Sequence, residues 1–472
     1  MSGEQLYTFQ EFEKADSKAD FIWKAIQSHK QSDLYQTAKI ADTYDRQQNQ
    51  TINEYVATLF DLLGNKVVNY TASNAKIASN FFHRLNTQRC MYSLGNGVSF
   101  IEGAETGEDE TKDALGKHFD HDIQDAAYKA LIHGVCFCFW NVDRLYNFPV
   151  TEFVPLWDEY EGTLKAGIRF WQLGANYPLS AVLYEVDGFT KYQADRDSRS
   201  MLKEIEPKRA YMETVVKAPA DDHEELIGVE NYSSLPIVPL WGSKLHQSTL
   251  IGMRESIDSY DLIQSGFANN LTDCSEIYWI IENAGGMNDK DMARFLDRLV
   301  VNHIAAVDSD DGTKVTPYRQ DIPYEARKTY LDCIRNRIYE DFGALDVHTV
   351  AAGATNDHID AAYQPMDEEA ADFEFQVGDC IRQILALMGK DDSPVFKRNR
   401  ISNQMEQVEM VVAEAQWLDT QTILQKLPNV SPDEVQAILD RNAAEDDQRM
   451  NFASNFISVT EDGTVREHTD EF

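Results

Sequence analysis

His118 and His121 are the only two histidines that lie close together in the sequence. Residues three apart share one face of a helix, so both imidazoles could bind one zinc ion. A zinc protease of the HExxH type also needs a glutamate between its histidines and a third ligand, and neither accompanies this pair. The neighbouring residues are rich in acids, which is typical of a solvated surface. We therefore predict no metal and no cofactor, with an acidic metal-dependent hydrolase as the alternative.

Other sequence patterns that carry catalysis are missing. There is no GxxxxGK[ST] loop, so any ATP hydrolysis would belong to a partner. No Ser-His-Asp order and no nucleophile elbow stands out. The six cysteines are scattered without CxxC spacing, and Cys136 and Cys138 lie in the apolar run CFCFW. We expect reduced cysteines buried in the core, and a protein that is not an enzyme.

The charge balance excludes several binding functions. The 472 residues carry 43 basic and 79 acidic side chains, a formal net charge of −36. Such a surface repels phosphate groups and anionic lipids, which excludes a tight DNA-binding protein. The sequence has no run of eighteen apolar residues, and its start lacks the features of a signal peptide. We expect a soluble intracellular protein of two to four modules, without membrane partners.

Hydrophobic periodicity predicts the elements that would position these residues. Apolar side chains three or four apart predict helices within residues 15–65, 75–92 and 124–133. Between residues 135 and 241 the apolar residues alternate or form short runs, such as EFVPLW and LPIVPLW. These runs predict mainly antiparallel β-structure, and the fold class is therefore α+β.

Two long helices are predicted near residues 248–275 and 324–345. They bracket about 40 residues that begin with the strand-like YWII. At a rise of 1.5 Å per residue, helices of this length would hold that small α/β module roughly 30 Å from the body. A module held so far out would contact another molecule. The alternative is a helical hairpin packed inside one domain.

The segment after the second long helix is acidic. It mixes small residues with Asp and Glu until helical periodicity returns at residues 373–388. A further helix is expected at residues 402–417, and residues 431–434, SPDE, have the order of a helix start. The final dozen residues have the composition of a frayed acidic tail.

Several short motifs occur in a definite order along the chain. Residues 80–100 contain NFFHRL and YSLGNGVSF, residues 155–171 contain PLWD and GIRFW, and residues 235–261 contain LPIVP and IDSYD. Together these motifs resemble the portal proteins of tailed double-stranded DNA bacteriophages with long non-contractile tails, and the similarity reaches from about residue 40 to residue 440. One departure is Gly97, where proline is common in the family. Another is NDHIDAA at residues 356–362, where many relatives carry a Ser-Gly-x-Ala-hydrophobic run.

The resemblance implies a portal fold with a helical and β-rich wing, two long stem helices around a small α/β clip, and a helical crown. The implied divisions are a wing (1–247), stem helix one (248–278), the clip (279–322), stem helix two (323–345), a tunnel-loop region (346–372), a return to the wing (373–400), the crown (401–457) and an acidic tail (458–472).

The resemblance also implies a function. Portal proteins form a homo-oligomeric ring, usually of twelve subunits, at one vertex of the capsid, and double-stranded DNA is packaged and ejected through it without sequence specificity. The implied partners are the large terminase subunit, the head-tail adaptor, and the major capsid and scaffold proteins. The ring would assemble in the host cytoplasm and remain in the virion. Another head or tail component, such as an adaptor or minor capsid protein, is the alternative.

Candidate site residues follow from this resemblance. A channel for a polyanion should hold few basic side chains, because each phosphate contact adds affinity and therefore drag. The DNA-channel candidates are Lys328, Arg335, Asn356, Asp357, His358 and Asp360. The clip candidates for partner binding are Asp308, Asp310, Asp311 and Lys314. The subunit-interface candidates are Ile257, Tyr260, Phe267, Leu331, Ile334 and Ile338.

An alternative to DNA contact stays open for the basic residues of the second long helix. Besides Lys328 and Arg335, these include Arg327 and Arg337. They could instead pair with acids on the same or a neighbouring helix, namely Glu325, Asp332, Glu340 and Asp341.

Overall fold

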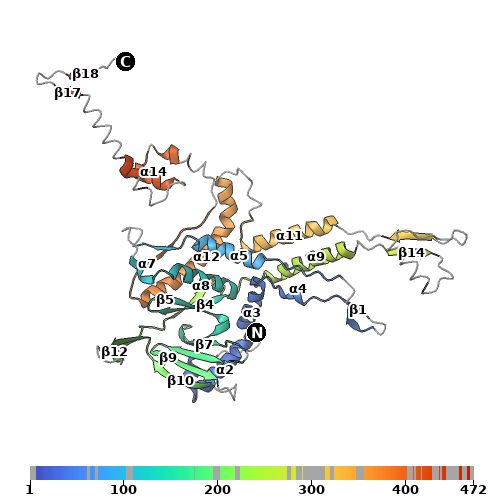
Figure 1. Ribbon diagram of the computed structural model, residues 1–472, viewed down its shortest axis with the longest axis horizontal. Coiled ribbons are helices and arrows are strands. Elements are labelled where there is room, and N and C mark those ends of the chain that lie inside the picture. The colour runs from blue at the N-terminus through green and yellow to red at the C-terminus, as the bar shows by residue number, and fades with distance from the viewer. Residues whose placement is uncertain are drawn as a thin grey trace. The chain divides into compact units, whose positions relative to one another are not determined.

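The structure, a computed structural model, describes residues 7–60, 64–69, 73–101, 110–174, 176–194, 202–217, 224–273, 278–282, 290, 314–318, 324–346, 356–400, 408, 411–415, 417–427, 435, 438–442, 457–459 and 465–467 (Figure 1). The chain divides into two compact units. The larger contains residues 1–344 and 365–399, and the smaller contains residues 345–364 and 400–472. The mixture of helices and sheets confirms the α+β class. Within the described ranges, no helix combines the length and the apolarity needed to cross a membrane.

The larger unit opens with short helices, namely α1 (Phe9–Glu13), α2 (Lys18–Gln31), α3 (Asp33–Asp45) and α4 (Gln50–Glu54). The side chains of Ser17 and Ser32 accept backbone N–H groups where α2 and α3 begin. The helical prediction for residues 15–65 is wrong beyond Glu54, because β1 (Thr58–Phe60) pairs with β2 (Lys66–Val68). Of the expected apolar stripe, Ile52 is buried, whereas Val56 is 44% exposed, so the buried face ends with α4.

The β-structure predicted between residues 135 and 241 is confirmed and forms two larger antiparallel sheets. The three-stranded sheet has the order β13 (Ile237–Trp241), β4 (Val135–Asn141) and β5 (Arg144–Pro149). The five-stranded sheet has the order β10 (Leu202–Arg209), β9 (Gly188–Ala194), β8 (Ser180–Glu185), β7 (Leu164–Trp171) and β6 (Phe153–Trp157). A separate hairpin pairs β11 (Met212–Lys217) with β12 (Glu224–Glu230).

Proline occupies every edge strand of these two sheets and none of their inner strands. The edge prolines are Pro155 in β6, Pro207 in β10, Pro239 in β13 and Pro149 in β5. Proline has no N–H, so a strand tolerates it where the missing donor would face away from the sheet. The edge strands β6 and β13 also share the sequence VPLW, and their tryptophans, Trp157 and Trp241, stack with ring centroids 6.1 Å apart.

Each sheet is covered by helices. The helices α8 (Phe119–His133) and α12 (Asn356–Leu387) pack on the three-stranded sheet, and α2 packs on the five-stranded sheet. Cys136 and Cys138 of β4 and Cys380 of α12 are buried in the first of these cores, as predicted for the cysteines. The hydrogen bond with Cys138 and burial raise the pKa of Cys136. The contact with Cys136 lowers the pKa of Cys138, but the hydrogen bond with Cys380 and burial outweigh it and raise that pKa, so both thiols are held in the protonated form.

Both long helices are confirmed, with shorter bounds than predicted. They are α9 (Arg254–Asp273) and α11 (Tyr324–Phe342), which lie side by side (Figure 1). Between them in the sequence, β14 (Tyr278–Glu282) pairs antiparallel with β15 (Lys314–Tyr318). The strand-like YWII is therefore a strand, and the rest of the small module lies outside the described residues.

The helix α12 begins at Asn356, well before residue 373 where helical periodicity was expected to return, and it continues through Pro365. Its buried side chains form one seam, namely Ile359, Tyr363, Met366, Ala370, Phe373 and Val377. Steps of four, three, four, three and four are the spacing of a helix. Small and acidic residues between these positions conceal the pattern in the sequence.

Residues 75–80 do not form the start of the helix that was predicted there. The helix expected from residue 75 is α5 (Phe81–Leu94), and the residues before it have no regular secondary structure. After α5, β3 (Val98–Phe100) pairs with β16 (Pro394–Phe396), and α7 (Glu110–Leu115) precedes α8.

The smaller unit contains the helix α14 (Thr420–Lys426), whose first turn is capped by the side chain of Asp419. In place of a frayed tail, β17 (Ile457–Val459) pairs with β18 (Val465–Glu467). Residues 411–414 are helical, in agreement with part of the helix predicted at 402–417, whereas residues 431–434 lie outside the described part of the chain.

Candidate functional site: the paired helices α9 and α11

The helices α9 and α11 pack antiparallel. The ring of Phe267 lies 5.7 Å from that of Tyr324, and Arg327 Nη1 donates to the carbonyl oxygen of Gly266 at 3.5 Å. At the other end of the pair, Ile257 and Ile338 share one buried cluster. The first helix therefore runs toward β14 and the second runs back from β15.

The buried seam of this pair faces the chain's own core. Ile257, Ile334 and Ile338 are buried in a cluster with Phe81 and Phe82 of α5. A side chain covered by its own chain offers little surface to a neighbour, and the role of these three residues at a subunit interface stays a prediction. The periodicity predicted a buried face, but it could not predict that α5 supplies the cover.

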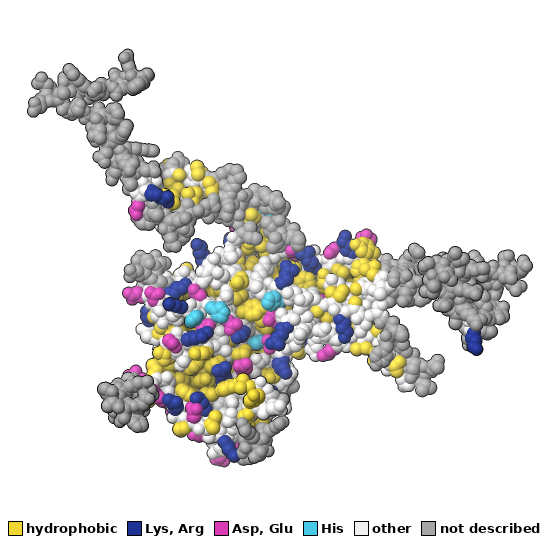
Figure 2. Space-filling view, viewed as in Figure 1, with side chains coloured by type: hydrophobic (Ala, Val, Ile, Leu, Met, Phe, Trp, Pro, Cys, Tyr) yellow, Lys and Arg dark blue, Asp and Glu magenta, His cyan; other side chains and the backbone are white. Residues whose placement is uncertain are grey.

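The other three interface candidates, Tyr260, Phe267 and Leu331, are each half-buried, so part of each side chain stays accessible. Sequence reasoning did not select three further apolar side chains on the same helices as interface candidates, although Leu271 continues the apolar spacing of α9. They are Leu271 (55% exposed), Tyr324 (51%) and Tyr330 (48%). Figure 2 shows apolar side chains gathered over the ends of α9 and α11 that lead to β14 and β15.

The basic residues of α11 have different surroundings. Arg337 pairs with Asp341, with Nε 3.2 Å from Oδ2, which confirms the pairing alternative for this residue. The guanidinium of Arg335 lies 5.5 Å from the ring centroid of Tyr339, and that of Arg327 lies 5.9 Å from Phe267. Lys328 is exposed.

The four channel candidates after α11 lie on the first turns of α12, not in a loop. His358 and Asp360 are exposed, and Asp360 accepts a hydrogen bond from Arg400 at 3.0 Å. Asn356 and Asp357 belong to the helix, but their side chains lie outside the described part of the structure. Both described side chains therefore stand on a regular helix.

The clip candidates Asp308, Asp310 and Asp311 lie outside the described residues. Lys314 is the first residue of β15 and stands opposite Glu282 in the register of β14 and β15.

The polar face of α9 carries two aspartates of the motif IDSYD. Asp258 accepts hydrogen bonds from Tyr44 Oη at 2.5 Å and Thr51 Oγ1 at 2.7 Å. Asp261 is fully buried, and its oxygens accept from Asn49 Nδ2 at 2.5 Å and from the backbone N–H of Ser79 at 2.9 Å. Burial raises the pKa of Asp261, although these hydrogen bonds act in the opposite direction. The motif therefore attaches α9 to the N-terminal part of the chain.

The C-terminal end of α11 is held by a buried cation. Arg89 of α5 donates from Nη2 to the carbonyl oxygen of Phe342, and the same nitrogen lies 3.3 Å from Glu369 Oε2 of α12. Burial lowers the pKa of Arg89, and the acids Glu369 and Asp372 oppose this shift. A positive charge at the end of a helix stabilises its unpaired carbonyls. The chain then turns at Gly343, whose φ of +63° favours glycine.

The structure gives the histidine pair no metal-binding environment. His118 precedes α8, and His121 is 81% exposed, with Nδ1 3.3 Å from Asp122 Oδ1. In the part of the chain that the structure describes, no group of three or more His, Cys, Asp or Glu residues could hold a metal ion. One cysteine expectation is also corrected, because Cys333 is exposed on the outer face of α11.

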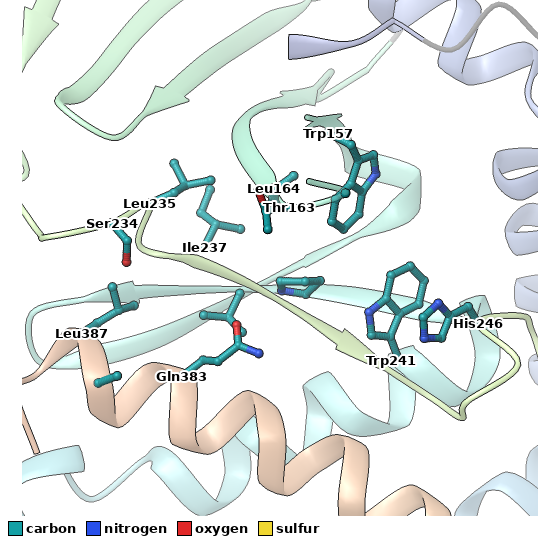
Figure 3. Close-up of a pocket in the computed structure, with 14 residues that line it drawn as sticks. Trp157, Thr163, Leu164, Ser234, Leu235, Ile237, Trp241, His246, Gln383 and Leu387 are labelled. Carbon is teal, nitrogen blue, oxygen red and sulfur yellow. The ribbon is translucent and has the colours of Figure 1, made fainter. Parts of the chain in front are cut away.

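A pocket of about 570 Å³ lies along β13 in the larger unit, between the β6–β7 turn and the end of α12 (Figure 3). Trp157, Trp241 and His246 lie on one side, and the ring of His246 stacks on that of Trp241 with centroids 3.8 Å apart. The lining includes one imidazole and no carboxylate, thiol or amine. It therefore offers no pair of groups for general acid–base catalysis. Sequence reasoning missed this pocket, although the repeated VPLW marks two of its walls.

Comparisons with known proteins show that the chain is similar to phage portal proteins. The portal protein of Clostridium phage phiCD119 is 23% identical over 377 residues, covering 75% of this chain and 81% of that protein. The portal protein of Bacillus phage SPP1 is 23% identical over 390 residues, covering 75% of this chain and 73% of that protein. The family model described as phage portal protein, SPP1 Gp6-like, matches residues 24–448.

Phage portal proteins are structural components of the virion and not enzymes, which agrees with the function class expected from the sequence. The family match extends over most of the chain, from the N-terminal helices through both long helices to the smaller unit. This chain belongs to the family of SPP1 Gp6-like phage portal proteins.

Proposed function

We propose that this chain forms a ring, usually of twelve subunits, at one vertex of a phage capsid, and that double-stranded DNA passes through its centre during packaging and ejection. The observation that carries this proposal is the antiparallel pair α9 and α11, which brackets the strands β14 and β15 within the region that matches the portal family. With 20 and 19 residues, these helices are each about 30 Å long at 1.5 Å per residue. They would form the stem, and residues 279–322 would form the clip.

The proposed contacts between subunits use the side chains of this pair that stay accessible. These are Tyr260, Phe267 and Leu331, together with the exposed Leu271, Tyr324 and Tyr330. A head-to-tail contact joins two different surfaces of neighbouring copies, and it closes into a ring when the rotation between them divides a full turn. Apolar side chains left outside the core on two adjacent helices suit such a contact.

The charge distribution suits a channel through which DNA slides. A net charge of −36 repels the DNA backbone from most of the surface. Lys328 is exposed on α11 and is the strongest candidate for a sparse ring of positive charge in the channel. Arg335, His358 and Asp360 remain candidates, although Asp360 also pairs with Arg400. A few phosphate contacts would guide the duplex without holding it.

Each proposed partner is assigned to a different part of the chain. The clip would bind the large terminase subunit during packaging and the head-tail adaptor afterwards. The wing would meet the major capsid and scaffold proteins, and residues 401–457, as the crown, would face the inside of the head. The ring would assemble in the host cytoplasm, and it would act without a membrane and without a cofactor.

Electron microscopy of the purified full-length protein tests the ring. We expect closed rings with a central opening, and native mass spectrometry of the same sample should give one main oligomer near twelve copies. A thin ring would indicate an adaptor, and a single compact particle at all concentrations would refute the proposal.

A pair of matched variants locates the contact. Leu271→Glu puts a charge on an exposed residue of α9, whereas Ile251→Glu puts the same charge on a residue of equal exposure before α9. We expect Leu271→Glu to weaken the ring and Ile251→Glu to leave it intact. Equal effects of the two variants would refute a contact at this face of the pair.

The clip is tested with a block of charge reversals. Replacing Asp308, Asp310 and Asp311 with lysine should leave rings intact and weaken binding of the purified large terminase subunit. Unchanged terminase binding and unchanged packaging would refute the assignment of residues 279–322 as the docking element.

A further inference from the structure

A row of three side chains on α9 accepts hydrogen bonds from the irregular segment before α5. Asp261 Oδ1 accepts the N–H of Ser79 at 2.9 Å, Ser265 Oγ accepts the N–H of Ile77 at 3.0 Å, and Asn269 Oδ1 accepts the N–H of Ala75 at 2.6 Å. The acceptors are four residues apart on the helix, and the donors are two residues apart on the segment. The segment runs antiparallel to α9.

The two spacings match in length. Four residues of an α-helix rise about 6 Å, and two residues of extended chain cover about 6.6 Å. A nearly straight segment can therefore place every second N–H on successive turns of one helix face. In an extended chain neighbouring residues direct their N–H groups to opposite edges, so a shift by one residue would leave the helix acceptors without donors, and the contact has one favourable register. The mismatch grows by about 0.6 Å with each step, which keeps the row short.

The opposite edge of the segment is attached to the connection between α3 and α4. Gln47 Nε2 donates to the carbonyl oxygen of Ala78 at 2.8 Å, and Asn49 Nδ2 donates to that of Ser79 at 3.1 Å. Lys76 Nζ donates to the carbonyl oxygen of Asn53. The segment is therefore bound on one edge by α9 and on the other by residues 47–53.

Asn49 makes this tertiary contact instead of capping the helix that it precedes. It stands at the N-cap of α4, where asparagine usually accepts an N–H from the first turn, yet its side chain makes no such bond. Its amide nitrogen instead donates to Asp261 of α9 and to Ser79 of the segment. A residue that departs from its local preference in this way indicates a selected tertiary contact.

The attachment of this segment is polar throughout. No residue between 73 and 80 is buried, whereas the adjacent α5 and α9 contribute Phe82 and Ile257 to a fully covered cluster. Detaching the segment would therefore expose little apolar surface, and water could replace each lost hydrogen bond. Segments with few apolar contacts open at much lower free energy than the core around them.

We propose that residues 73–79 are a releasable strap that couples α9 to the α3–α4 connection and opens as one unit from a single register. When α9 turns or shifts along its axis, the three acceptors move together, so the strap loses its contacts together. The core cluster of α5, α9 and α11 can stay closed during this change. The inference rests on the hydrogen bonds of one chain and holds whether or not the ring forms.

Hydrogen exchange measured by mass spectrometry on the full-length protein tests the strap. Ser265→Ala removes the middle acceptor, and Ser256→Ala, on the same helix but outside the row, is the matched control. Because one hydrogen bond contributes about 1 kcal/mol, we expect Ser265→Ala to speed exchange of residues 73–80 about five-fold. Peptides from α5 and α8 should be unchanged. Equal exchange in the two variants, or equal acceleration in α5, would overturn the proposal.

Two proline variants test the register. Ile77→Pro removes an N–H that faces α9, whereas Ala78→Pro removes the next N–H and keeps the carbonyl bound by Gln47. We expect limited proteolysis within residues 73–80 to be faster in Ile77→Pro than in Ala78→Pro. Equal cleavage of both would show that no alternating register exists.

A variant at the edge bound by residues 47–53 tests whether the strap opens as one unit. Gln47→Ala removes a contact at Ala78 only, but a strap that opens as one unit should then also exchange faster at Ala75 and Ile77. Acceleration confined to Ala78 and Ser79 would refute opening as a unit.

Discussion

Truncating Ile338 tests whether this side chain belongs to the chain's own core or to a contact between subunits. Ile338 is fully buried in the cluster that joins α5, α9 and α11. Ile338→Ala removes three carbon atoms, and at about 0.8 kcal/mol per buried methylene the transfer contribution is about 2.4 kcal/mol. The cavity left behind adds to this loss, so we expect the free energy of unfolding to fall by about 3 to 4 kcal/mol.

Urea denaturation followed by circular dichroism measures this loss, and native mass spectrometry in parallel measures the oligomer. The matched control is Leu331→Ala on the same helix, because Leu331 is half-buried and should lose only about 1 kcal/mol. Ile338→Glu should lose rings because the chain itself unfolds around a buried charge. If Ile338→Ala leaves the urea midpoint unchanged and only the oligomer dissociates, the placement of this side chain in the chain's own core is refuted.

Three further predictions concern the polar contacts of the same region. Burial raises the pKa of Asp261 above its ordinary value of 3.8, so its contribution to stability is fully present below about pH 3.8 and is lost as the pH rises through the raised value. In urea titrations at a series of pH values, the free energy of unfolding of the wild type minus that of Asp261→Asn should fall as the pH rises from 3.8 through the raised pKa. A difference that stays constant with pH would contradict this. Gly343→Ala should lower the free energy of unfolding by about 1 kcal/mol because of the positive φ at this position, and it should lower it further because the new Cβ would lie 2.8 Å from Glu369 Cγ. Gly389→Ala, at a φ of +71° with open space around it, measures the contribution of the positive φ alone in thermal melts. Equal melting temperatures of these two variants would exclude the contact. Arg89→Met should lower the free energy of unfolding by about 2 kcal/mol, because the carbonyl of Phe342 at the end of α11 loses its donor. Arg337→Met, which removes an exposed ion pair, should lower it by about 0.5 kcal/mol or less. Equal losses of the two variants in urea denaturation would refute the capping role of Arg89.

The long helices and the β-rich middle of the chain were predictable because their periodicity extends over many residues. The seam of α11 steps by three and four from Leu331 through Ile338, and local pattern alone selects a helix there. The same pattern shows only that a face is buried. It holds no information about which element covers that face, and here the cover comes from Phe81 and Phe82, about 250 residues earlier in the chain.

The strap could not be predicted for a related reason. Ala75, Ile77 and Ser79 fit the start of a helix that continues into α5, so local preference favours helix. The competing interactions are hydrogen bonds to acceptors on α9 that lie almost 200 positions later. Tertiary contacts override helix propensity when they satisfy the same backbone donors.

The start of α12 was missed because two misleading signals coincide there. Pro365 indicates a break, and the small and acidic residues around it conceal the apolar spacing, although alanine and glutamate are themselves good helix formers. A search for the seam alone, with steps of four and three from Ile359 to Val377, would have found the helix. Strong periodicity is therefore better evidence than composition for a segment of this kind.

The prolines of the edge strands affect how copies of this protein behave when crowded. Every border of the two larger sheets carries a residue that cannot donate to an added strand, so a second molecule finds no unbroken ladder to extend. Copies produced together in an infected cell can then collide repeatedly without fusing sheet to sheet into fibrils. Their association is left to side-chain surfaces, which can specify a finite assembly.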